Sequence, residues 1–342
     1  MLTKTLRKFG IPLMVSVLIA GMLAGCSSGS AKTNTPASTT GGINQKSTAN
    51  EEYVWISCDS SLPMFVDNDQ AGLKQFGKDY GVKVEVVGPT DADTSACANT
   101  IDEVIAQKPA GIMIIGWDES LKNAVNKAVA SGIPTVLVDS DLSDTNRACF
   151  VGTDWHNVGV AHAEQMVKYT KGKGKVAVEM ILGAQNMNDA LNGYKSVLAK
   201  YPQMQLVSTL DTKGDVSQAT QDTSNLISAY PDLAGISNFD GSTPGVGPAI
   251  KSANKVGKIV CTGMNVDAPQ IKLLQDGVFN ALVGQKRALF TYYAGVVLYS
   301  MNHTNVKVTA NDKAMGIDNV PQSIDTGLFV VDKNNVKDFA GK

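Results

Sequence analysis

The sequence predicts an α/β fold made of two doubly wound parallel-sheet lobes joined by a hinge. Short β-branched runs alternate with longer stretches of helical periodicity from Tyr53 to about residue 300, which is the pattern of repeated βαβ units. Runs such as 111–115 are apolar throughout, as expected of strands that helices cover on both faces. About ten such runs are many for one twisted sheet. A Lys- and Gly-rich turn at 171–175 opens the second series, so we expect two lobes.

The expected strands are short apolar or β-branched runs, each followed by polar or small residues. They are 53–56, 82–87, 111–115, 135–138, 149–151, 176–180, 206–210, 234–237, 259–262 and 279–283. The expected helices show apolar residues at a spacing of three and four. They are 65–80, 94–107, 121–131, 158–170, 193–200, 216–230 and 270–276. The first lobe is expected to hold residues 51–153 plus about 286–318, and the second lobe 154–285 plus about 319–342.

The N-terminus carries the pattern of an export signal. Lys4, Arg7 and Lys8 precede an apolar run at 11–23, which is shorter than the roughly 20 residues that a bilayer-spanning helix needs. The run ends in Leu-Ala-Gly-Cys at 23–26, which resembles the bacterial lipobox. It predicts a lipoprotein signal peptide at 1–25 and lipidation of Cys26; the alternative is an ordinary signal peptide with a chance cysteine. Residues 26–50 are mostly small and polar, which predicts a flexible tether to the membrane.

Composition excludes several functional classes. The formal net charge is −2 and falls by three units, to −5, when the three basic residues of the signal peptide are removed. Lysine and arginine are scattered rather than clustered, so we expect no nucleic-acid partner. Cys58, Cys97, Cys149 and Cys261 lack a disulfide or metal-ligand spacing, which favours buried free thiols, with a single bridge as the alternative. The three histidines form no ligand-spaced pair, so no metal site and no cofactor are expected.

Polar residues follow nearly every predicted strand. In open α/β sheets the ligand lies outside the carboxyl ends of the strands, where this chain supplies Asp, Asn and Gln beside aromatic rings. Carboxylates and amides bind hydroxyl groups, and aromatic faces cover the apolar faces of a sugar ring. Asp139 ends an apolar strand, where an unpaired carboxylate is costly, and is the strongest single candidate. Asp118, Asp154 and Asp240 have helix capping as an alternative role, and Trp117 and Trp155 have rim packing.

Catalysis fits the sequence poorly, and no catalytic residue is predicted. A Gly-x-Ser-x-Gly motif and a Walker loop are absent, and Gly245-Val246-Gly247 lacks the later glycine of a dinucleotide fingerprint. Asp139 and Asp141 lie two positions apart, which suits a binding pair or a ligand residue and its cap better than an acid and a base.

These strand ends are similar to those of the ribose-binding-type family of solute-binding proteins, the extracytoplasmic receptors of ABC sugar importers, which have the type I periplasmic binding protein fold. The resemblance covers roughly residues 52 to 340. It rests on Pro63-Met64-Phe65, the 133–139 strand, Gly152-Thr153-Asp154, Asn238-Phe239-Asp240 and Gln285. It implies a cleft lined by Phe65, Asp139, Asn188, Phe239, Asn265 and Gln285. Family members often have Arg where this chain has Ser140 and Asn188, and Asp where it has Asn265, which puts ribose itself in doubt.

A second resemblance is to the receptor for the furanosyl signal autoinducer-2. It rests on Val87-Gly88-Pro89-Thr90, Asp139-Ser140-Asp141 and Pro244. That receptor has a lysine at the end of its first strand, where this chain has Ser57-Cys58-Asp59-Ser60. Two further hypotheses are compatible with the sequence: a chemosensory sugar receptor without a transport role, and an enzyme acting on extracellular carbohydrate.

The sequence thus predicts a non-enzymatic, membrane-tethered receptor that binds a monosaccharide or related polyol. Its expected partners are an ABC permease with a cytoplasmic ATPase and the membrane itself, and the receptor is expected to be a monomer on the outer face of the cell membrane or in the periplasm. The candidate ligand-binding residues are Asp59, Ser60, Met64, Phe65, Trp117, Asp139, Asp141, Asp154, Trp155, Asn188, Phe239, Asp240, Asn265 and Gln285.

Overall fold

A computed structural model describes residues 48–304 and 306–339. Its strands are β1 Glu52–Ile56, β2 Lys83–Val87, β3 Gly111–Ile115, β4 Thr135–Val138, β5 Cys149–Gly152, β6 Gly174–Met180, β7 Met204–Asp211, β8 Leu233–Asn238, β9 Val260–Met264, β10 Ala281–Gln285, β11 Ser323–Asp325 and β12 Leu328–Asp332. Its α-helices are α1 Gln70–Tyr80, α2 Thr94–Gln107, α3 Lys122–Ala130, α4 Trp155–Thr170, α5 Gln185–Leu198, α6 Val216–Ala229, α7 Val246–Ser252, α8 Ala268–Gln275, α9 Ala288–His303 and α10 Asp312–Met315. A π-helical turn, η1 Phe65–Asp69, leads into α1, and three 3₁₀ turns complete the set: η2 Glu119–Leu121, η3 Thr243–Gly245 and η4 Val336–Phe339.

The strands form two six-stranded sheets with matching topology. The first has the order β11-β5-β4-β3-β1-β2 and the second β12-β10-β9-β8-β6-β7. Strands β1 to β5 therefore occupy the same places in the first sheet as β6 to β10 in the second. Pairing is parallel throughout except that β12 runs antiparallel to β10. Two doubly wound lobes are thus confirmed, and the carboxyl ends of β4 and β9 are equivalent positions.

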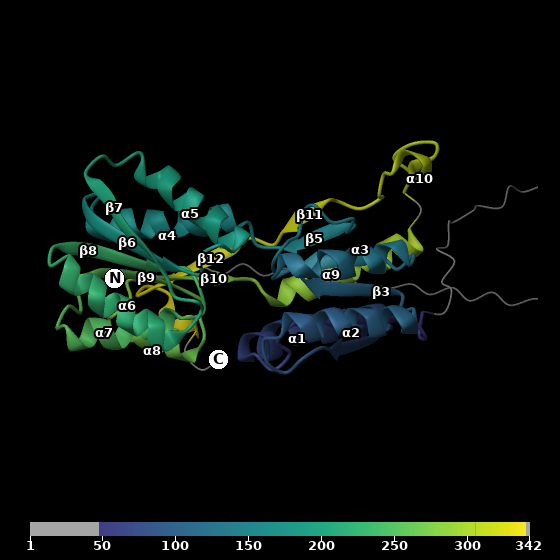
Figure 1. Cartoon of the computed structure of the whole chain (residues 1–342), viewed down its shortest axis with the longest axis horizontal. Helices are drawn as coiled ribbons and strands as arrows, with labels where there is room; N and C mark the ends of the chain where they lie inside the picture. The colour runs from purple at the N-terminus through teal and green to yellow at the C-terminus, as the bar shows by residue number, and fades with distance from the viewer. Residues whose placement is uncertain (1–47, 305, 340–342) are drawn as a thin grey trace, which may run out of the picture. The chain divides into compact units, whose positions relative to one another are not determined.

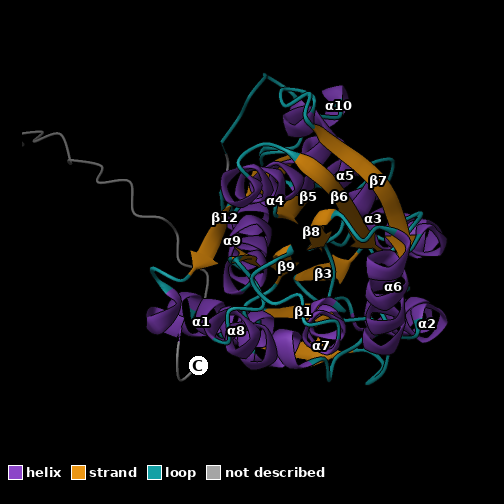
Figure 2. Ribbon diagram, turned by 90° about the vertical axis from the view of Figure 1, so that its left-hand side faces the viewer, coloured by secondary structure: helices purple, strands orange, loops and turns teal. Residues whose placement is uncertain are grey.

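Each sheet is buried on both faces, which explains the apolar strands. In β1, Tyr53 and Trp55 pack with α1 and α9, while Val54 and Ile56 pack with α2 and α3. This alternation is the two-residue period of a strand. In the second lobe, α4 and α5 cover one face of the sheet, and α6, α7 and α8 cover the other. Figure 2 shows α5 beside β6 and β7.

Helices α4 and α5 pack closely because each presents a glycine to the other. A Cβ added to Gly159 would lie 1.7 Å from the carbonyl oxygen of Ala190, and one added to Gly193 would lie 2.0 Å from that of His156. No side chain fits at either place, so the backbones approach as only glycine allows. This contact fixes the start of α4, which carries Trp155.

The chain passes between the sheets three times. The crossovers follow β5, β10 and β11, because α4 packs on the second sheet and α9 on the first. Strand β11 lies in the first sheet, so the last crossover is at residues 326–327, later than the boundary near 319 that the sequence suggested. Helix α5 begins eight residues before the expected 193, and α7, α9, α10, β11 and β12 were absent from the expected elements.

Other expectations concern the termini and the cysteines. Cys58, Cys97, Cys149 and Cys261 are free and buried, which confirms buried thiols. The predicted signal peptide, Cys26 and nearly all of the tether lie outside the described residues. Within residues 48–304 and 306–339, no helix has the length and apolarity to cross a bilayer.

Candidate functional site

Two equivalent strand ends have the same unusual backbone. Asp139 follows β4 with φ of 67°, and Asn265 follows β9 with φ of 71°. The amide of Asp139 donates to the carbonyl of Val151 at 3.1 Å, and that of Asn265 to the carbonyl of Val283 at 2.9 Å. Asp and Asn tolerate the left-handed region better than other non-glycine residues. Such conformations concentrate at ligand sites, so the structure singles out one polar residue at the same place in each lobe.

A buried arginine organises the first of these strand ends. Arg287 lies in the crossover after β10 and is 6% exposed. It donates from Nη1 to Asp139 Oδ1 at 2.9 Å and to Gln285 Oε1 at 3.2 Å, and from Nε to Asp69 Oδ2 at 2.9 Å. Gln285 in turn donates to Thr153 Oγ1 at 3.2 Å. We call Arg287 with Asp69, Asp139 and Gln285 the Arg287 network.

Two carboxylates in this network share one guanidinium. Burial raises the pKa of Asp69 to about 7, opposed by the charge of Arg287 and reinforced by that of Asp139. Burial acts to lower the pKa of Arg287, but the charges of Asp139 and Asp69 outweigh it and raise that pKa. Arg287 is therefore a permanent cation. The network carries no positive charge in excess, and it becomes more negative as Asp69 ionises.

Aromatic rings surround Asp139. The ring of Phe65 lies 5.4 Å from that of Trp117 and 4.9 Å from the Arg287 guanidinium. Trp117 donates to Asp139 Oδ2 and Trp155 to the Asp139 carbonyl, both at 3.4 Å. Trp117 is 36% exposed, so its ring borders solvent. The structure thus brings together five of the predicted residues: Phe65, Trp117, Asp139, Trp155 and Gln285.

Asp141 and Asp154 have partners away from the Arg287 network. Asp141 accepts two hydrogen bonds from Arg147, at 2.6 and 2.5 Å. Asp154 is the N-cap of α4 and accepts from the amide of Asn157 at 3.3 Å, which confirms the capping alternative. Asp118 caps η2 in the same way, by accepting from the amide of Ser120.

Asp240 and Phe239 lie inside the second lobe. Asp240 is 3% exposed and accepts from Thr212 Oγ1 at 2.5 Å and from the amide of Ser242 at 2.7 Å. Phe239 has no exposed surface and packs against the rings of His162 and Tyr194. Both are therefore buried within the second lobe, as Phe65 and Asp139 are within the first, and their role in ligand binding stays a prediction.

Asn188 and the predicted residues Asp59, Ser60 and Met64 are partly buried. Asn188 lies in the first turn of α5 and not in a loop after β6, because that helix begins at Gln185. Ser60 donates its hydroxyl to the carbonyl of Gly88 at 3.5 Å. Burial raises the pKa of the partly buried Asp59. Asn265 Nδ2 lies 3.9 Å from Met64 Sδ, a contact between residues of the two lobes.

Arg287 and Asp69 were not among the ligand-binding residues predicted from the sequence. Asp69 lies four residues after Phe65, at the end of the π-helical turn. It was not predicted because it falls inside the expected helix 65–80 and not at a strand end. Single π-helical turns associated with α-helices are frequently found at functional sites. Arg287 lies two residues after Gln285, in a segment read only as a crossover. Its position beside a predicted ligand residue was the available signal.

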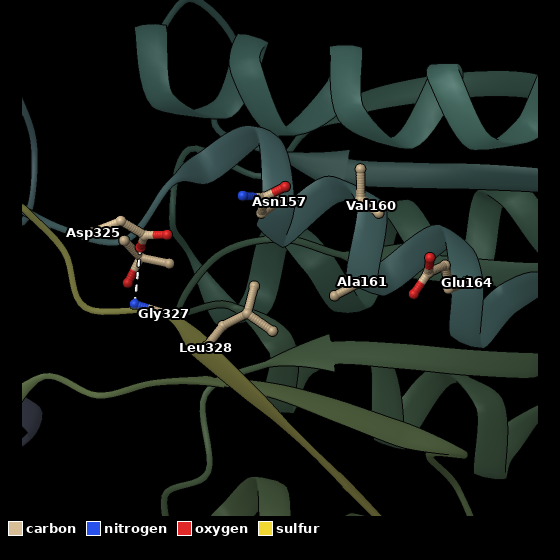
Figure 3. A pocket seen from close by; sticks show the side chains of 8 residues that line it. Asn157, Val160, Ala161, Glu164, Asp325, Gly327 and Leu328 are labelled. Atoms are coloured by element: carbon tan, nitrogen blue, oxygen red, sulfur yellow. Dashed lines mark hydrogen bonds between the residues drawn. The ribbon is translucent and has the colours of Figure 1, made fainter.

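A separate cavity of about 310 Å³ lies at two of the crossovers (Figure 3). Val160 and Ala161 of α4 and Leu328 of β12 supply its apolar wall, with Glu164 and Asp325 at its edge. None of the predicted ligand residues lines this cavity. It meets the site only through Thr153, the partner of Gln285. We therefore place the candidate site at the Arg287 network and not in this cavity.

No cluster of His, Cys, Asp and Glu suited to a metal ion occurs among the residues that the structure describes.

Residues 53–302 match the model of a family described as periplasmic binding protein domain. The chain belongs to this family.

Several similar proteins carry the names of sugar import or binding proteins. The chain is 27% identical to the D-apiose import binding protein of Paraburkholderia graminis, over 57% of this chain and 62% of that protein. It is 26% identical to the ribose import binding protein of Bacillus subtilis, over 66% of this chain and 73% of that protein. The chain thus spans less than two thirds of the first of these relatives.

Solved structures cover more of the chain. A sugar-binding protein of a sugar ABC transporter from Bacillus halodurans superposes with a TM-score of 0.79 at 27% identity, covering 84% of this chain and 100% of the other. An arabinose binding protein from Geobacillus stearothermophilus gives 0.77 at 29% identity, covering 85% and 100%.

Proposed function

We propose that this protein is the extracytoplasmic solute-binding receptor of an ABC importer and binds a monosaccharide or related polyol at the Arg287 network. The observation that carries the proposal is the placement of Asp139. Asp139 follows β4 with a left-handed backbone. Its carboxylate accepts hydrogen bonds from Arg287 and Trp117, and the Trp117 ring packs against that of Phe65.

The chemistry of this position suits a neutral hydroxylated ring. A carboxylate has about four lone-pair sites, and the Asp139 carboxylate accepts two side-chain hydrogen bonds, from Arg287 and Trp117. The remaining lone pairs accept hydroxyl donors, and the Trp117 ring offers a flat apolar surface. Because Asp69 and Asp139 already neutralise Arg287, an anionic ligand finds no unpaired cation in the network.

The relatives support the same class of ligand. D-Apiose, ribose and D-allose appear in the names of similar import or binding proteins, and xylitol in that of another. These are neutral sugars or polyols. The proposed mechanism is hinge bending about the three crossovers, driven by the preference of the ligand for the closed arrangement.

The proposal includes the cellular setting. We infer a monomeric, non-enzymatic receptor anchored through a lipid on Cys26, with a permease and its ATPase as partners. The Leu-Ala-Gly-Cys motif at 23–26 and the polar segment that follows it support this inference. The anchor would hold the captured solute near the permease, because a flexible tether of n residues reaches roughly 5–6 Å times the square root of n.

The test is a calorimetric titration of the wild-type protein with D-ribose, D-allose, D-apiose, L-arabinose and xylitol. We expect at least one to bind with a 1:1 stoichiometry and to raise the melting temperature. Ribose 5-phosphate serves as the anionic control and is expected to show no heat of binding. If no neutral sugar or polyol in the panel binds, the proposed function is wrong.

A further inference from the structure

Arg287 is placed to act on two predicted ligand residues from opposite lobes. Asp139 ends β4 of the first sheet, Gln285 ends β10 of the second, and Nη1 of Arg287 donates to both, at 2.9 and 3.2 Å. A guanidinium donates in a fixed planar fork. The directions of the two acceptor groups are therefore tied to each other through one nitrogen.

The position of Arg287 itself is set from several sides. Nε and Nη2 donate to the two oxygens of Asp69, at 2.9 and 3.4 Å. The rings of Phe65 and Phe290 lie 4.9 and 5.1 Å from the guanidinium carbon. Asp69 is fixed in turn, because Thr291 donates to its carbonyl at 2.5 Å. The fork thus has one well-defined orientation.

We propose that Arg287 is a positioning residue for ligand capture: it presets Asp139 and Gln285 and links them to the crossover at Thr153. The inference rests on the proposed function and deepens it. Four of the five N–H groups of Arg287 are engaged within the protein, and its side chain is 6% exposed. It therefore acts through its neighbours rather than as a principal ligand of the sugar.

The link to the crossover gives the residue a second effect. Gln285 accepts from Arg287 through Oε1 and donates through Nε2 to Thr153, which follows β5. A chain of hydrogen bonds thus joins Asp139 to two of the three segments that pass between the sheets. A ligand that binds Asp139 alters one end of this chain, and the segments about which the lobes turn hold the other end.

A purely structural role for Arg287 predicts different behaviour. If the residue only neutralised buried carboxylates, lysine would replace it at a modest cost in stability, with no specific loss of binding. Lysine keeps the charge but has one nitrogen and no planar fork. It cannot hold Asp69, Asp139 and Gln285 in the same arrangement, so charge and positioning are separable.

The experiment compares Arg287→Lys with Arg147→Lys in the full mature chain. Arg147 is a matched control because it also donates hydrogen bonds from two nitrogens to an aspartate, Asp141, and belongs to the same lobe. Both variants and the wild type are titrated with the sugar from the panel above that the wild type binds. Amide hydrogen exchange of residues 152–158 and 284–288 is measured without ligand.

We expect Arg287→Lys to bind at least about tenfold more weakly, as for loss of a hydrogen bond to a charged group, and to exchange faster in both segments. Arg147→Lys is expected to stay within about threefold of wild-type affinity, with unchanged exchange there. Wild-type affinity in Arg287→Lys, or an equal loss in both variants, would overturn the positioning role alone. A wild-type protein that binds no sugar would overturn the proposed function and this inference together.

Discussion

Replacement of Asp139 separates the binding role of its carboxylate from its structural role. In Asp139→Asn the left-handed backbone at φ of 67° is retained, because Asn tolerates it, and an oxygen still accepts from Arg287. Asp69 continues to neutralise the guanidinium. We therefore expect the apo protein to lose only about 1 kcal/mol of stability.

The effect on binding is larger. A hydrogen bond to a charged group contributes about 1.5–3 kcal/mol, and the variant lacks the charge that a ligand hydroxyl would meet. Affinity is therefore expected to fall at least about tenfold. Asp139→Ala adds the cost of a left-handed alanine, roughly 1–2 kcal/mol, so its apo stability falls by about 2–3 kcal/mol and binding is lost.

The assay is urea unfolding of the apo protein combined with calorimetric titration. Asp141→Asn is the matched control, because Asp141 lies two residues away, pairs with Arg147 and stands 25% exposed. It is expected to bind as the wild type does. The reasoning is refuted if Asp139→Asn binds normally, or if its binding falls no more than that of Asp141→Asn.

Three further predictions concern the fold. Burial raises the pKa of Glu179 from 4.5 to about 7. The contribution of Glu179 to folding stability is therefore present below pH 4.5 and lost as the pH rises through 7. In urea unfolding, Glu179→Gln should gain about 3 kcal/mol of stability relative to the wild type between pH 4.5 and about 8, and a difference that does not change with pH would contradict this. Gly159→Ala should lose about 1–3 kcal/mol in the same assay, because its Cβ meets a carbonyl oxygen at 1.7 Å, whereas Gly241→Ala, with no atom within 4 Å, should not. A reductant should leave the melting temperature unchanged because Cys58, Cys97, Cys149 and Cys261 are free; a clear drop would indicate a disulfide.

The architecture was readable from the sequence because both faces of each sheet are buried. Such strands appear as unbroken apolar runs, and strands 111–115 and 135–138 match β3 and β4 residue for residue. Helix α9 was missed because its sequence is apolar on most sides, so its period is weak. Strands β11 and β12 follow an irregular segment and lack the βαβ spacing that identified the others.

The site was only partly readable. Polar strand ends follow from the topology of a parallel sheet, which brought Asp139 and Gln285 into view. Pairing across the chain does not follow from local pattern: Arg287 meets Asp69 and Asp139 from 218 and 148 residues away. Likewise, a buried aromatic residue after a strand can pack beside the polar site, as Phe65 does against Trp117 and Arg287, or against rings elsewhere in its lobe, as Phe239 does against Tyr194.

The proposed function depends on a sugar binding at Asp139. A crystal structure of the protein with the sugar that the calorimetric panel identifies tests it most directly. We expect hydroxyl groups within hydrogen-bond distance of Asp139, the sugar ring against Trp117, and Arg287 still in contact with Asp69. A sugar bound instead in the cavity beside Thr153 and Leu328, with Asp139 untouched, would contradict the account.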